Sequence, residues 1–188
     1  MIKAVIFDCF GVLTADKWKE FVGTIPDKLR ESARDINHAY DAGFINEEEF
    51  ISQIKKLTGT SPGEVETIMA DDRTKNTKLL NYIATLKLRY KIGLLSNIAT
   101  NWIREEFLTP DEQTLFDEYI LSYEVHLTKP DPRIFKIACE RLGVEPSEAV
   151  LVDDIERYCD AAREFGIQAI CYKDFVQTKR ELEQILAG

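Results

Sequence analysis

The sequence predicts an α/β fold in which a doubly wound parallel sheet is interrupted, after its first strand, by an all-helical insertion. Short apolar runs recur along the chain, at residues 4–7, 92–95, 119–121, 149–152 and 167–171. Amphipathic stretches separate the later runs, and this alternation is typical of parallel strands joined by helices that cover both faces of a sheet. No strand pattern occurs between about residues 15 and 80. At 188 residues, the chain suits one domain that carries a modest insertion.

The first apolar run leads directly into an acidic residue and a turn. Ala4 to Phe7 include two β-branched side chains, which is typical of a strand buried on both faces. Asp8 ends the run, and Gly11 marks a turn. A carboxylate at this end of a strand points into the crevice where open α/β sheets bind ligands. The alternative is that Asp8 only caps the turn, and the segment alone supports both interpretations equally.

Start and stop signals divide the insertion into four or five helices. Pro26 can begin a helix whose apolar positions recur every three to four residues. Asn46 and Glu49 resemble a capping box at the start of the next helix, which Gly59 ends. The same kind of start signal recurs at residues 61–64, and the apolar series of residues 79–86 predicts a longer last helix that leads back to a strand.

The rest of the chain returns to strands and helices in alternation. Helices are predicted around residues 102–107 and at 131–142, 161–165 and 175–186. The strand of residues 92–95 ends in Ser96 and Asn97, and the strand of residues 149–152 ends in Asp153 and Asp154.

Polar side chains therefore follow three predicted strands, whose ends meet at one edge of a parallel sheet. Asp153 and Asp154, facing Asp8, would repel one another unless a cation lies among them. Carboxylate oxygens of this kind suit Mg²⁺. The alternative role for Asp153 and Asp154 is to cap the next helix, but this does not explain two acids in succession.

Ser96 and Lys129 add the donors of an anion site, since a hydroxyl and an ammonium both bind phosphate oxygens. Lys129 stands in the segment TKPDP, where Pro130 and Pro132 restrict its backbone. A solvated surface lysine is the default interpretation. Because the predicted strand ends also carry polar side chains, a functional role for Lys129 is favoured.

Composition narrows the functional class. A net charge of −9 argues against a nucleic-acid or anionic-membrane surface. No apolar run reaches the ~20 residues that span a bilayer, and the start does not resemble a signal peptide, so we expect a cytoplasmic protein. The four cysteines are scattered, which disfavours a zinc site or a disulfide framework, and we expect Cys9 to be a packing residue.

The segments FDCFGV, LLSN, TKPDP and VLVDD, followed by DAAREFG, resemble the four ordered motifs of the haloacid dehalogenase superfamily of hydrolases. AYDAGFINEEEF resembles part of that superfamily's small helical cap. The resemblance implies a Rossmann-like core over residues 1–14 and 85–188, with the cap over residues 15–84. A closer likeness is to glucose-1-phosphatase-like and epoxide-hydrolase-associated phosphatase domains.

The resemblance also implies roles for individual residues. Asp8 would be the nucleophile that takes the phosphoryl group as an aspartyl-phosphate, with Ser96 and Lys129 as its catalytic partners. The phosphate-binding residues would be Cys9 and Phe10 through their backbone N–H groups, together with Ser96, Asn97 and Lys129. The Mg²⁺ ligands would be Asp8, the backbone carbonyl of Phe10, Asp153 and Asp154.

Two positions depart from the family pattern. Phosphatases of this superfamily usually carry a second aspartate where this chain has Phe10, and losing such a general acid–base typically removes about 10²–10⁴ in rate. Metal-free dehalogenases of the superfamily carry an aromatic residue there, a tyrosine, but they lack the acidic pair. Tyr158 stands where many relatives have asparagine. The leaving-group proton would then come from water, from the substrate, or from another acid such as Asp16, on the segment leading into the cap.

We therefore expect a Mg²⁺-dependent phosphatase acting on a small phosphorylated metabolite, with no nucleic-acid or membrane partner. The alternatives are a 2-haloacid dehalogenase and a degenerate, non-catalytic binder of a phosphorylated ligand. The substrate and the oligomeric state stay open. The cap residues that select substrate or simply pack are Trp18, Lys19, Phe21, Tyr40 and Phe44, and packing is expected for most of them.

Overall fold

A parallel five-stranded sheet forms the centre of the larger lobe in a computed structural model that describes residues 1–69 and 73–188. Its strands are β1 (Ala4–Phe7), β2 (Lys91–Ser96), β3 (Glu118–Leu121), β4 (Ala149–Asp153) and β5 (Gln168–Cys171). Their order is β3-β2-β1-β4-β5, so β1 lies in the middle with β2 and β4 beside it. The predicted doubly wound α/β class is confirmed.

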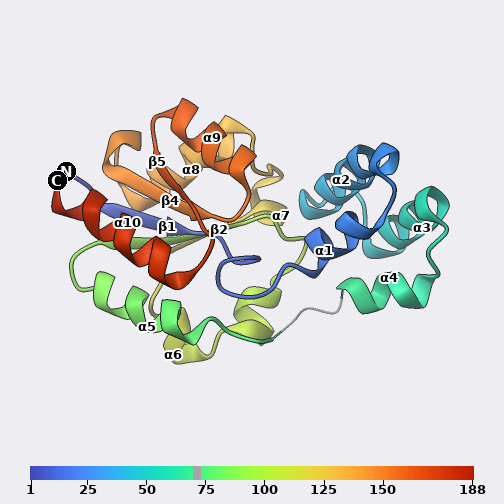
Figure 1. Ribbon diagram of the computed structural model, residues 1–188, viewed down its shortest axis with the longest axis horizontal. Coiled ribbons are helices and arrows are strands. Elements are labelled where there is room, and N and C mark those ends of the chain that lie inside the picture. The colour runs from blue at the N-terminus through green and yellow to red at the C-terminus, as the bar shows by residue number, and fades with distance from the viewer. Residues whose placement is uncertain (70–72) are drawn as a thin grey trace.

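Helices surround the sheet and fill a second lobe (Figure 1). They are α1 (Lys17–Thr24), α2 (Asp27–Asp41), α3 (Glu47–Thr58), α4 (Pro62–Met69), α5 (Thr77–Leu86), α6 (Pro110–Gln113), α7 (Ser122–Val125), α8 (Pro132–Leu142), α9 (Glu156–Phe165) and α10 (Phe175–Ala187), with a π-helical turn η1 (Ile103–Phe107) and a 3₁₀ turn η2 (Pro146–Glu148). The helix predicted around residues 102–107 is thus only the short turn η1.

The side chains of β1 alternate between two apolar clusters, as the pleat of a strand requires. Val5 and Phe7 face the cluster that contains residues of α5 and α10, whereas Ala4 and Ile6 face the cluster built with α8 and α9. All four of these side chains are fully buried. The sheet is therefore covered on both faces, and its carboxyl edge is left as the place for polar side chains.

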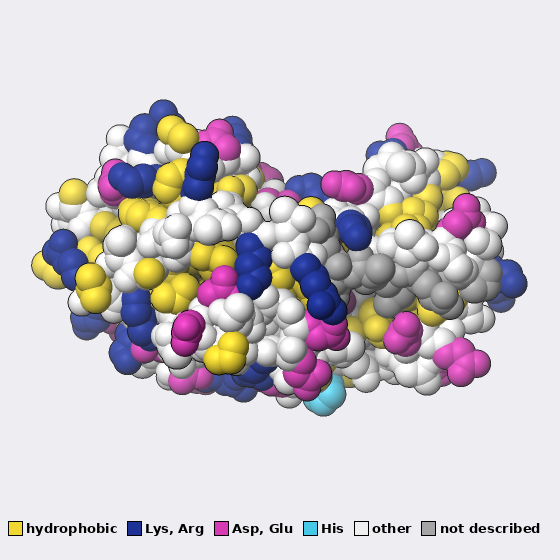
Figure 2. Space-filling view, turned by 90° about the horizontal axis from the view of Figure 1, so that it is seen from below, with side chains coloured by type: hydrophobic (Ala, Val, Ile, Leu, Met, Phe, Trp, Pro, Cys, Tyr) yellow, Lys and Arg dark blue, Asp and Glu magenta, His cyan; other side chains and the backbone are white. Residues whose placement is uncertain are grey.

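Helices α1 to α4 form a separate lobe, which we call the cap, with an apolar cluster of its own that includes Ala33, Phe50 and Ile54. The capping box of Asn46 and Glu49 is present at the start of α3. The space-filling view shows two lobes with a notch between them along the upper edge, and basic and acidic side chains are intermixed on the visible surface (Figure 2).

Helix α5 packs on the sheet and not in the cap. Its residues Leu79, Leu80 and Ile83 are buried in the same cluster as Val5 and Phe7. The expected cap range of 15–84 contains this helix, and it also contains residues 70–72, which lie outside the described residues. We therefore propose that the division between core and cap falls between α4 and α5.

None of the helices in the described part of the chain is long and apolar enough to cross a membrane. Cys9, Cys139, Cys159 and Cys171 form no disulfide among the described residues, and Cys9 is fully buried in the cluster that contains Val5.

Candidate active site

Asp8 stands at the carboxyl end of β1, in the middle of the sheet. Its backbone N–H donates to the carbonyl of Val152 at 2.9 Å, which continues the ladder between β1 and β4 by one residue. Its carboxylate oxygen Oδ1 accepts from the backbone N–H of Cys9 at 2.7 Å. Only 5% of the residue is exposed. The ladder and the following turn thus fix this carboxylate at the edge of the sheet.

Lys129 lies fully buried against Asp8. Its ammonium Nζ is 2.9 Å from Asp8 Oδ1 and 2.6 Å from Asp153 Oδ2, and it donates to the carbonyl of Leu95 at 3.1 Å. Three acceptors match the three protons of an ammonium. Lys129 is therefore not a solvated surface lysine.

Asn97 holds the backbone of that lysine in place. The N–H of Lys129 donates to Asn97 Oδ1 at 2.8 Å, and Asn97 Nδ2 donates to the carbonyl of Lys129 at 3.1 Å. Asn97 Nδ2 is also 3.4 Å from the hydroxyl of Tyr158. The amide of Asn97 is thus engaged in supporting Lys129, although the residue also lines the cleft.

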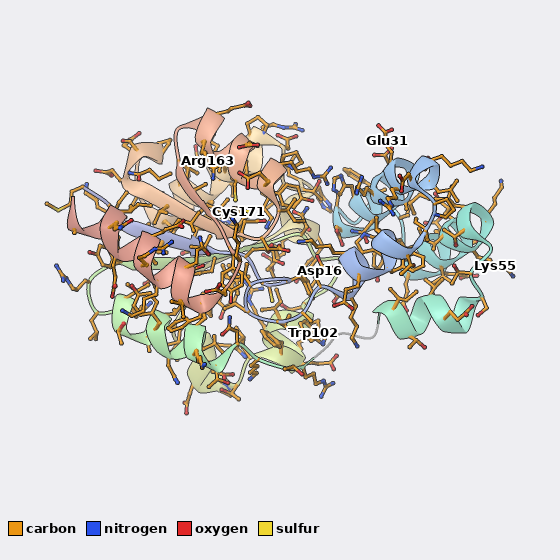
Figure 3. All side chains as sticks on the ribbon, viewed as in Figure 1. Asp16, Glu31, Lys55, Trp102, Arg163 and Cys171 are labelled. Atoms are coloured by element: carbon orange, nitrogen blue, oxygen red, sulfur yellow. The ribbon has the colours of Figure 1, made fainter. Side chains whose placement is uncertain are left out.

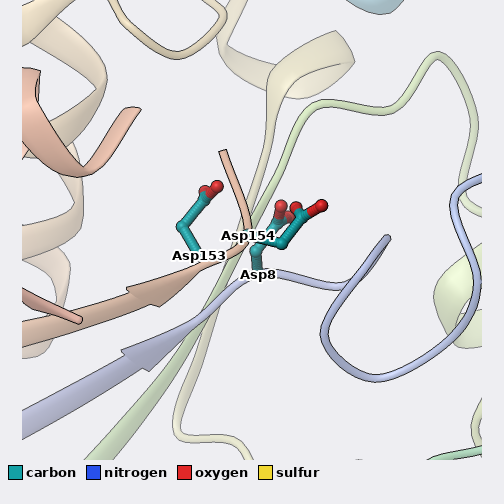
Figure 4. Close-up of side chains that lie close together, drawn as sticks. All are labelled: Asp8, Asp153 and Asp154. Carbon is teal, nitrogen blue, oxygen red and sulfur yellow. The ribbon is translucent and has the colours of Figure 1, made fainter. Parts of the chain in front are cut away.

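Asp153 and Asp154 end the neighbouring strand β4, and Figure 4 shows their carboxylates with that of Asp8. Asp153 is fully buried, and its Oδ1 accepts from the N–H of Ile155 at 2.9 Å. The N-cap position of α9 is Ile155, which makes no side-chain capping bond, so neither acid is the N-cap of that helix. Asp154 Oδ2 pairs with Lys19 of α1 in the cap.

These three carboxylates form a donor set that suits a hard cation. One oxygen of each lies within 4.8 Å of the others. The second oxygen of Asp154, Oδ1, is buried and has no hydrogen-bond partner among the described residues. A buried carboxylate oxygen without a partner is costly, and a divalent cation would satisfy it. The residues present therefore fit Mg²⁺.

Burial and charge act against each other at these groups. Burial raises the pKa of Asp8 well above its usual value, and the neighbouring Asp153 and Asp154 raise it further, while Lys129 opposes them. Burial would lower the pKa of Lys129, but the charges of Asp153 and Asp8 hold it above its usual value. The lysine is therefore charged, and Asp8 needs positive charge to ionise readily.

Ser96 ends β2 beside β1, and its side chain is fully buried. Its hydroxyl Oγ has no hydrogen-bond partner among the described residues. A buried hydroxyl normally finds one, so this orphaned donor is open to a ligand at the same edge of the sheet.

Phe10 has an aromatic and not a polar environment. Its ring stacks on Trp102 with centroids 5.8 Å apart, and Trp102 stacks on Phe107 at 4.9 Å. Phe10 and Trp102 also line the cleft. The ring of Phe10 is thus one end of an apolar aromatic stack.

A cleft of about 560 Å³ extends from Asp8 and Lys129 to the cap. The cap contributes Asp16, the N-cap residue of α1, whose Oδ1 accepts from the N–H of Lys19 at 2.8 Å. Figure 3 shows Asp16 at the start of α1, where the two lobes meet. Burial raises the pKa of Asp16.

The cap residues singled out in the sequence have different positions. Trp18 and Tyr40 line the cleft and also pack against the cap cluster, whereas Phe21 packs in that cluster without lining the cleft. Phe44 is 69% exposed. Lys19 pairs with Asp154, a contact between residues 135 positions apart that no sequence signal indicates.

Gly11, which the sequence indicates only as a turn residue, brings the loop after β1 close to the carboxylate of Asp154. Its φ is +78°, and a Cβ at this position would overlap the carboxylate of Asp154. Only glycine lets the loop after β1 pass this close to the acid.

The chain matches a family model described as haloacid dehalogenase-like hydrolase over residues 2–166. The D-ribitol-5-phosphate phosphatase of Bacteroides thetaiotaomicron is 27% identical over 204 residues, covering 99% of this chain and 99% of that protein. The bifunctional epoxide hydrolase 2 of Sus scrofa is 30% identical over 124 residues. That match covers 61% of this chain but only 22% of the pig protein.

A crystal structure of the HAD family enzyme bt-2542 from Bacteroides thetaiotaomicron, in complex with magnesium and inorganic phosphate, has a TM-score of 0.66 and 26% identity. The alignment covers 92% of this chain and 95% of that one. The (S)-2-haloacid dehalogenase 4A of Burkholderia cepacia is 28% identical over 81 residues, covering 43% of this chain and 35% of that protein.

Proposed function

The chain belongs to the haloacid dehalogenase-like hydrolases, and we propose that it is a Mg²⁺-dependent phosphatase that hydrolyses a small phosphorylated metabolite through an aspartyl-phosphate on Asp8. One observation carries this proposal. A buried lysine, a buried nucleophile candidate and two further acids meet at one sheet edge, and two polar atoms there, Ser96 Oγ and Asp154 Oδ1, have no partner among the described residues.

In the proposed first step, a carboxylate oxygen of Asp8 attacks phosphorus. The new O–P bond forms as the bond from phosphorus to the leaving oxygen breaks, and the alcohol departs after taking a proton. Water then attacks phosphorus, the bond to Asp8 breaks, and inorganic phosphate leaves with Asp8 restored. Lys129 and the hydroxyl of Ser96 bind the equatorial oxygens on which charge spreads.

Asp8, Asp153, Asp154 and the backbone carbonyl of Phe10 would hold the magnesium ion. When bound, it supplies the positive charge that keeps the carboxylates ionised beside a phosphate dianion. Asn97 fixes the backbone of Lys129 and so aims its ammonium. The backbone N–H of Cys9, which donates to Asp8 Oδ1 here, is available to the phosphoryl group once that oxygen bonds to phosphorus.

We assign the leaving-group proton to Asp16, since Phe10 cannot supply it. Asp16 lines the same cleft as Asp8, and burial raises its pKa, which favours the protonated form that an acid catalyst needs. A cleft of about 560 Å³ closed by a cap suits a small metabolite. The similarity to a D-ribitol-5-phosphate phosphatase supports a phosphorylated polyol or sugar as the first class to test.

Phe10 favours two other functions. An aromatic residue at this position also occurs in 2-haloacid dehalogenases, which form an ester on the nucleophile without a metal. It equally suits a protein that binds a phosphorylated ligand without turnover. The pair of acids at the end of β4 argues against the dehalogenase, because carbon–halogen cleavage needs no cation.

A panel of phosphorylated metabolites and 2-haloalkanoates, assayed with Mg²⁺ and with a chelator, separates these functions. We expect turnover of phosphate esters that the chelator abolishes and that Asp8→Asn lacks. Chelator-resistant release of halide would select the dehalogenase, and binding of inorganic phosphate without any turnover would select the non-catalytic protein.

A further inference from the structure

The cap rests on the core through polar contacts near the carboxyl end of α2. The hydroxyl of Ser122 donates to the carbonyl of Asp41 at 2.6 Å, and His126 Nδ1 is 2.9 Å from the carbonyl of Ala42. The apolar cluster of the cap is separate from the two clusters of the core. A polar interface of this kind can separate at modest cost, which a cap that admits substrate requires.

Tyr158 of α9 is the residue at which this interface meets the catalytic lysine. The residue is 5% exposed, and its ring lies 5.3 Å from Lys129 Nζ. Its hydroxyl is 3.3 Å from Nε2 of His38 on α2, accepts from Arg157 Nη2 at 3.0 Å, and is 3.4 Å from Asn97 Nδ2. One phenol thus contacts the cap, the catalytic lysine and the amide that positions this lysine.

The donors and acceptors in this network fix the state of His38. Arg157 Nη2 lies 2.9 Å from His38 Nε2, and a guanidinium only donates. Nε2 must therefore accept, which makes the imidazole neutral with its proton on Nδ1. The hydroxyl of Tyr158 accepts from Arg157 and Asn97, and its own proton is directed at the same lone pair of His38 Nε2, 3.3 Å away, as the weaker of the two donors that share it.

We infer that Tyr158 is a positioning residue that couples closure of the cap to the placement of Lys129, and that the coupling requires a neutral His38. The inference rests on the proposed phosphatase function for the role of Lys129. With the cap closed, the network holds the ring of Tyr158 against the ammonium. With the cap raised, Tyr158 loses its partner on α2 and its hold on Lys129 weakens.

The charges around His38 determine how the coupling changes with pH. Burial lowers the pKa of His38, Arg157 on α9 and Arg34 on α2 lower it further, and Asp35 opposes them. The closed arrangement therefore disfavours the imidazolium. This contact therefore stabilises the closed cap fully above the ordinary histidine pKa of about 6.5. The stabilisation is lost as the pH falls through the lower pKa that His38 has when the cap is closed.

His126, the other histidine of the chain, supplies a matched control. Its Nδ1 donates to the carbonyl of Ala42, and it can do so whether the ring is neutral or charged. Protonation thus breaks the contact at His38 but not the contact at His126.

The contact is tested by an NMR titration of the two histidines without ligand. His38 should titrate at a higher pH in Tyr158→Phe and in Arg157→Gln than in the wild type, and at an unchanged pH in His126→Gln. The same midpoint for His38 in the wild type, Tyr158→Phe and Arg157→Gln would overturn the inferred contact, whatever the protein's activity.

The coupling is tested by the binding of beryllofluoride with Mg²⁺, a mimic of the aspartyl-phosphate. Above pH 7 we expect Tyr158→Phe to bind about three- to tenfold more weakly, the loss of one hydrogen bond, and His38→Gln to bind normally because its amide can still accept from Arg157. As the pH falls from 7.5 to 5.5, wild-type affinity should fall more steeply than that of either variant.

A wild-type pH dependence in both variants would overturn the coupling even if the histidine titration supports the contact. Failure of the wild type to bind beryllofluoride at every pH would instead contradict the phosphatase proposal, and the ligand-free titration would still decide whether the contact exists.

Discussion

The ammonium of Lys129 lies 2.6 Å from Asp153 Oδ2, and neither side chain is exposed to solvent. Lys129 also pairs with Asp8, so the ends of β1 and β4 meet the loop that carries the lysine in one cluster of three charges. A buried charge is tolerated only when it is paired and hydrogen-bonded, so the acids and the lysine depend on one another.

Removing the lysine should therefore destabilise the fold. Lys129→Met leaves Asp8 and Asp153 buried without their counter-charge, and we expect the free energy of unfolding to fall by about 3–5 kcal/mol in the absence of Mg²⁺. Urea unfolding at neutral pH measures this loss. Lys136→Met, which removes an exposed pair with Glu140 at 3.7 Å, should change stability little. Equal effects of the two substitutions would contradict the assignment of Lys129 to a buried charge cluster.

Metal binding should depend on Asp153. Asp153→Ala removes one of the three clustered carboxylates and should weaken Mg²⁺ binding strongly in isothermal titration calorimetry. Asp160→Asn is a matched control, because Asp160 pairs with Arg163 on the surface and lies outside the cluster. Unchanged affinity in Asp153→Ala would remove the metal assignment.

The close approach of Gly11 to Asp154 predicts that a side chain at this position impairs both metal binding and stability. Gly11→Ala places a methyl group against the carboxylate and requires a positive φ, so we expect loss of Mg²⁺ binding together with lower thermal stability. At Gly23, inside α1, a Cβ meets nothing within 4 Å, and Gly23→Ala should stabilise the protein by about 0.5–1 kcal/mol. Retained metal affinity in Gly11→Ala would show that the loop after β1 can move away from the site.

Phe10 predicts a dependence on the leaving group. With no carboxyl there, Asp16 is the one acid assigned to the leaving group, so Asp16→Asn should hydrolyse a nitrophenyl phosphate, which leaves without a proton, much faster than an alkyl phosphate. On the Asp16→Asn background, Phe10→Asp should raise kcat for the alkyl ester by a substantial part of the ~10²–10⁴ attributed to general acid–base catalysis. It also breaks the stack on Trp102, so a thermal melt is needed beside the kinetics. No gain in a folded variant would mean that this backbone does not aim a carboxyl at the leaving oxygen.

Asp16 predicts an alkaline limit to activity. An acid catalyst must be protonated, and burial raises the pKa of Asp16, so kcat for an alkyl phosphate should fall as the pH rises through that raised pKa. Asp16→Asn should abolish this fall of kcat at high pH and should lower kcat for the alkyl ester, while leaving the hydrolysis of nitrophenyl phosphate nearly unchanged. If Asp16→Asn leaves the alkyl ester profile unaltered, another group donates the proton.

The sheet and the place of the site could be predicted from the sequence because their signals are local. Apolar runs mark the buried strands, and polar residues at their ends must meet once the strands are parallel. The capping box of Asn46 and Glu49 is local in the same way and is present in the structure. The roles of the site residues themselves stay predictions until the experiments above are done.

What the sequence could not indicate depends on contacts between distant segments. Lys19 meets Asp154 only because the cap folds back over the core, and α5 belongs to the sheet because of the surface it packs against, since its helical pattern suits either lobe. Tyr158 stood out as a departure from relatives, but its partner His38 lies on another lobe, 120 positions away.

Phosphoryl transfer to Asp8 is the central step, and rapid quenching observes it directly. The protein is mixed with Mg²⁺ and a phosphate ester labelled at phosphorus, quenched in acid within one turnover, and digested for peptide mass analysis. We expect label on the peptide that contains Asp8, its loss on a chase with unlabelled ester, and none in Asp8→Asn. Release of labelled inorganic phosphate at the same rate by Asp8→Asn, with no labelled protein at any time, would contradict a covalent mechanism at this residue.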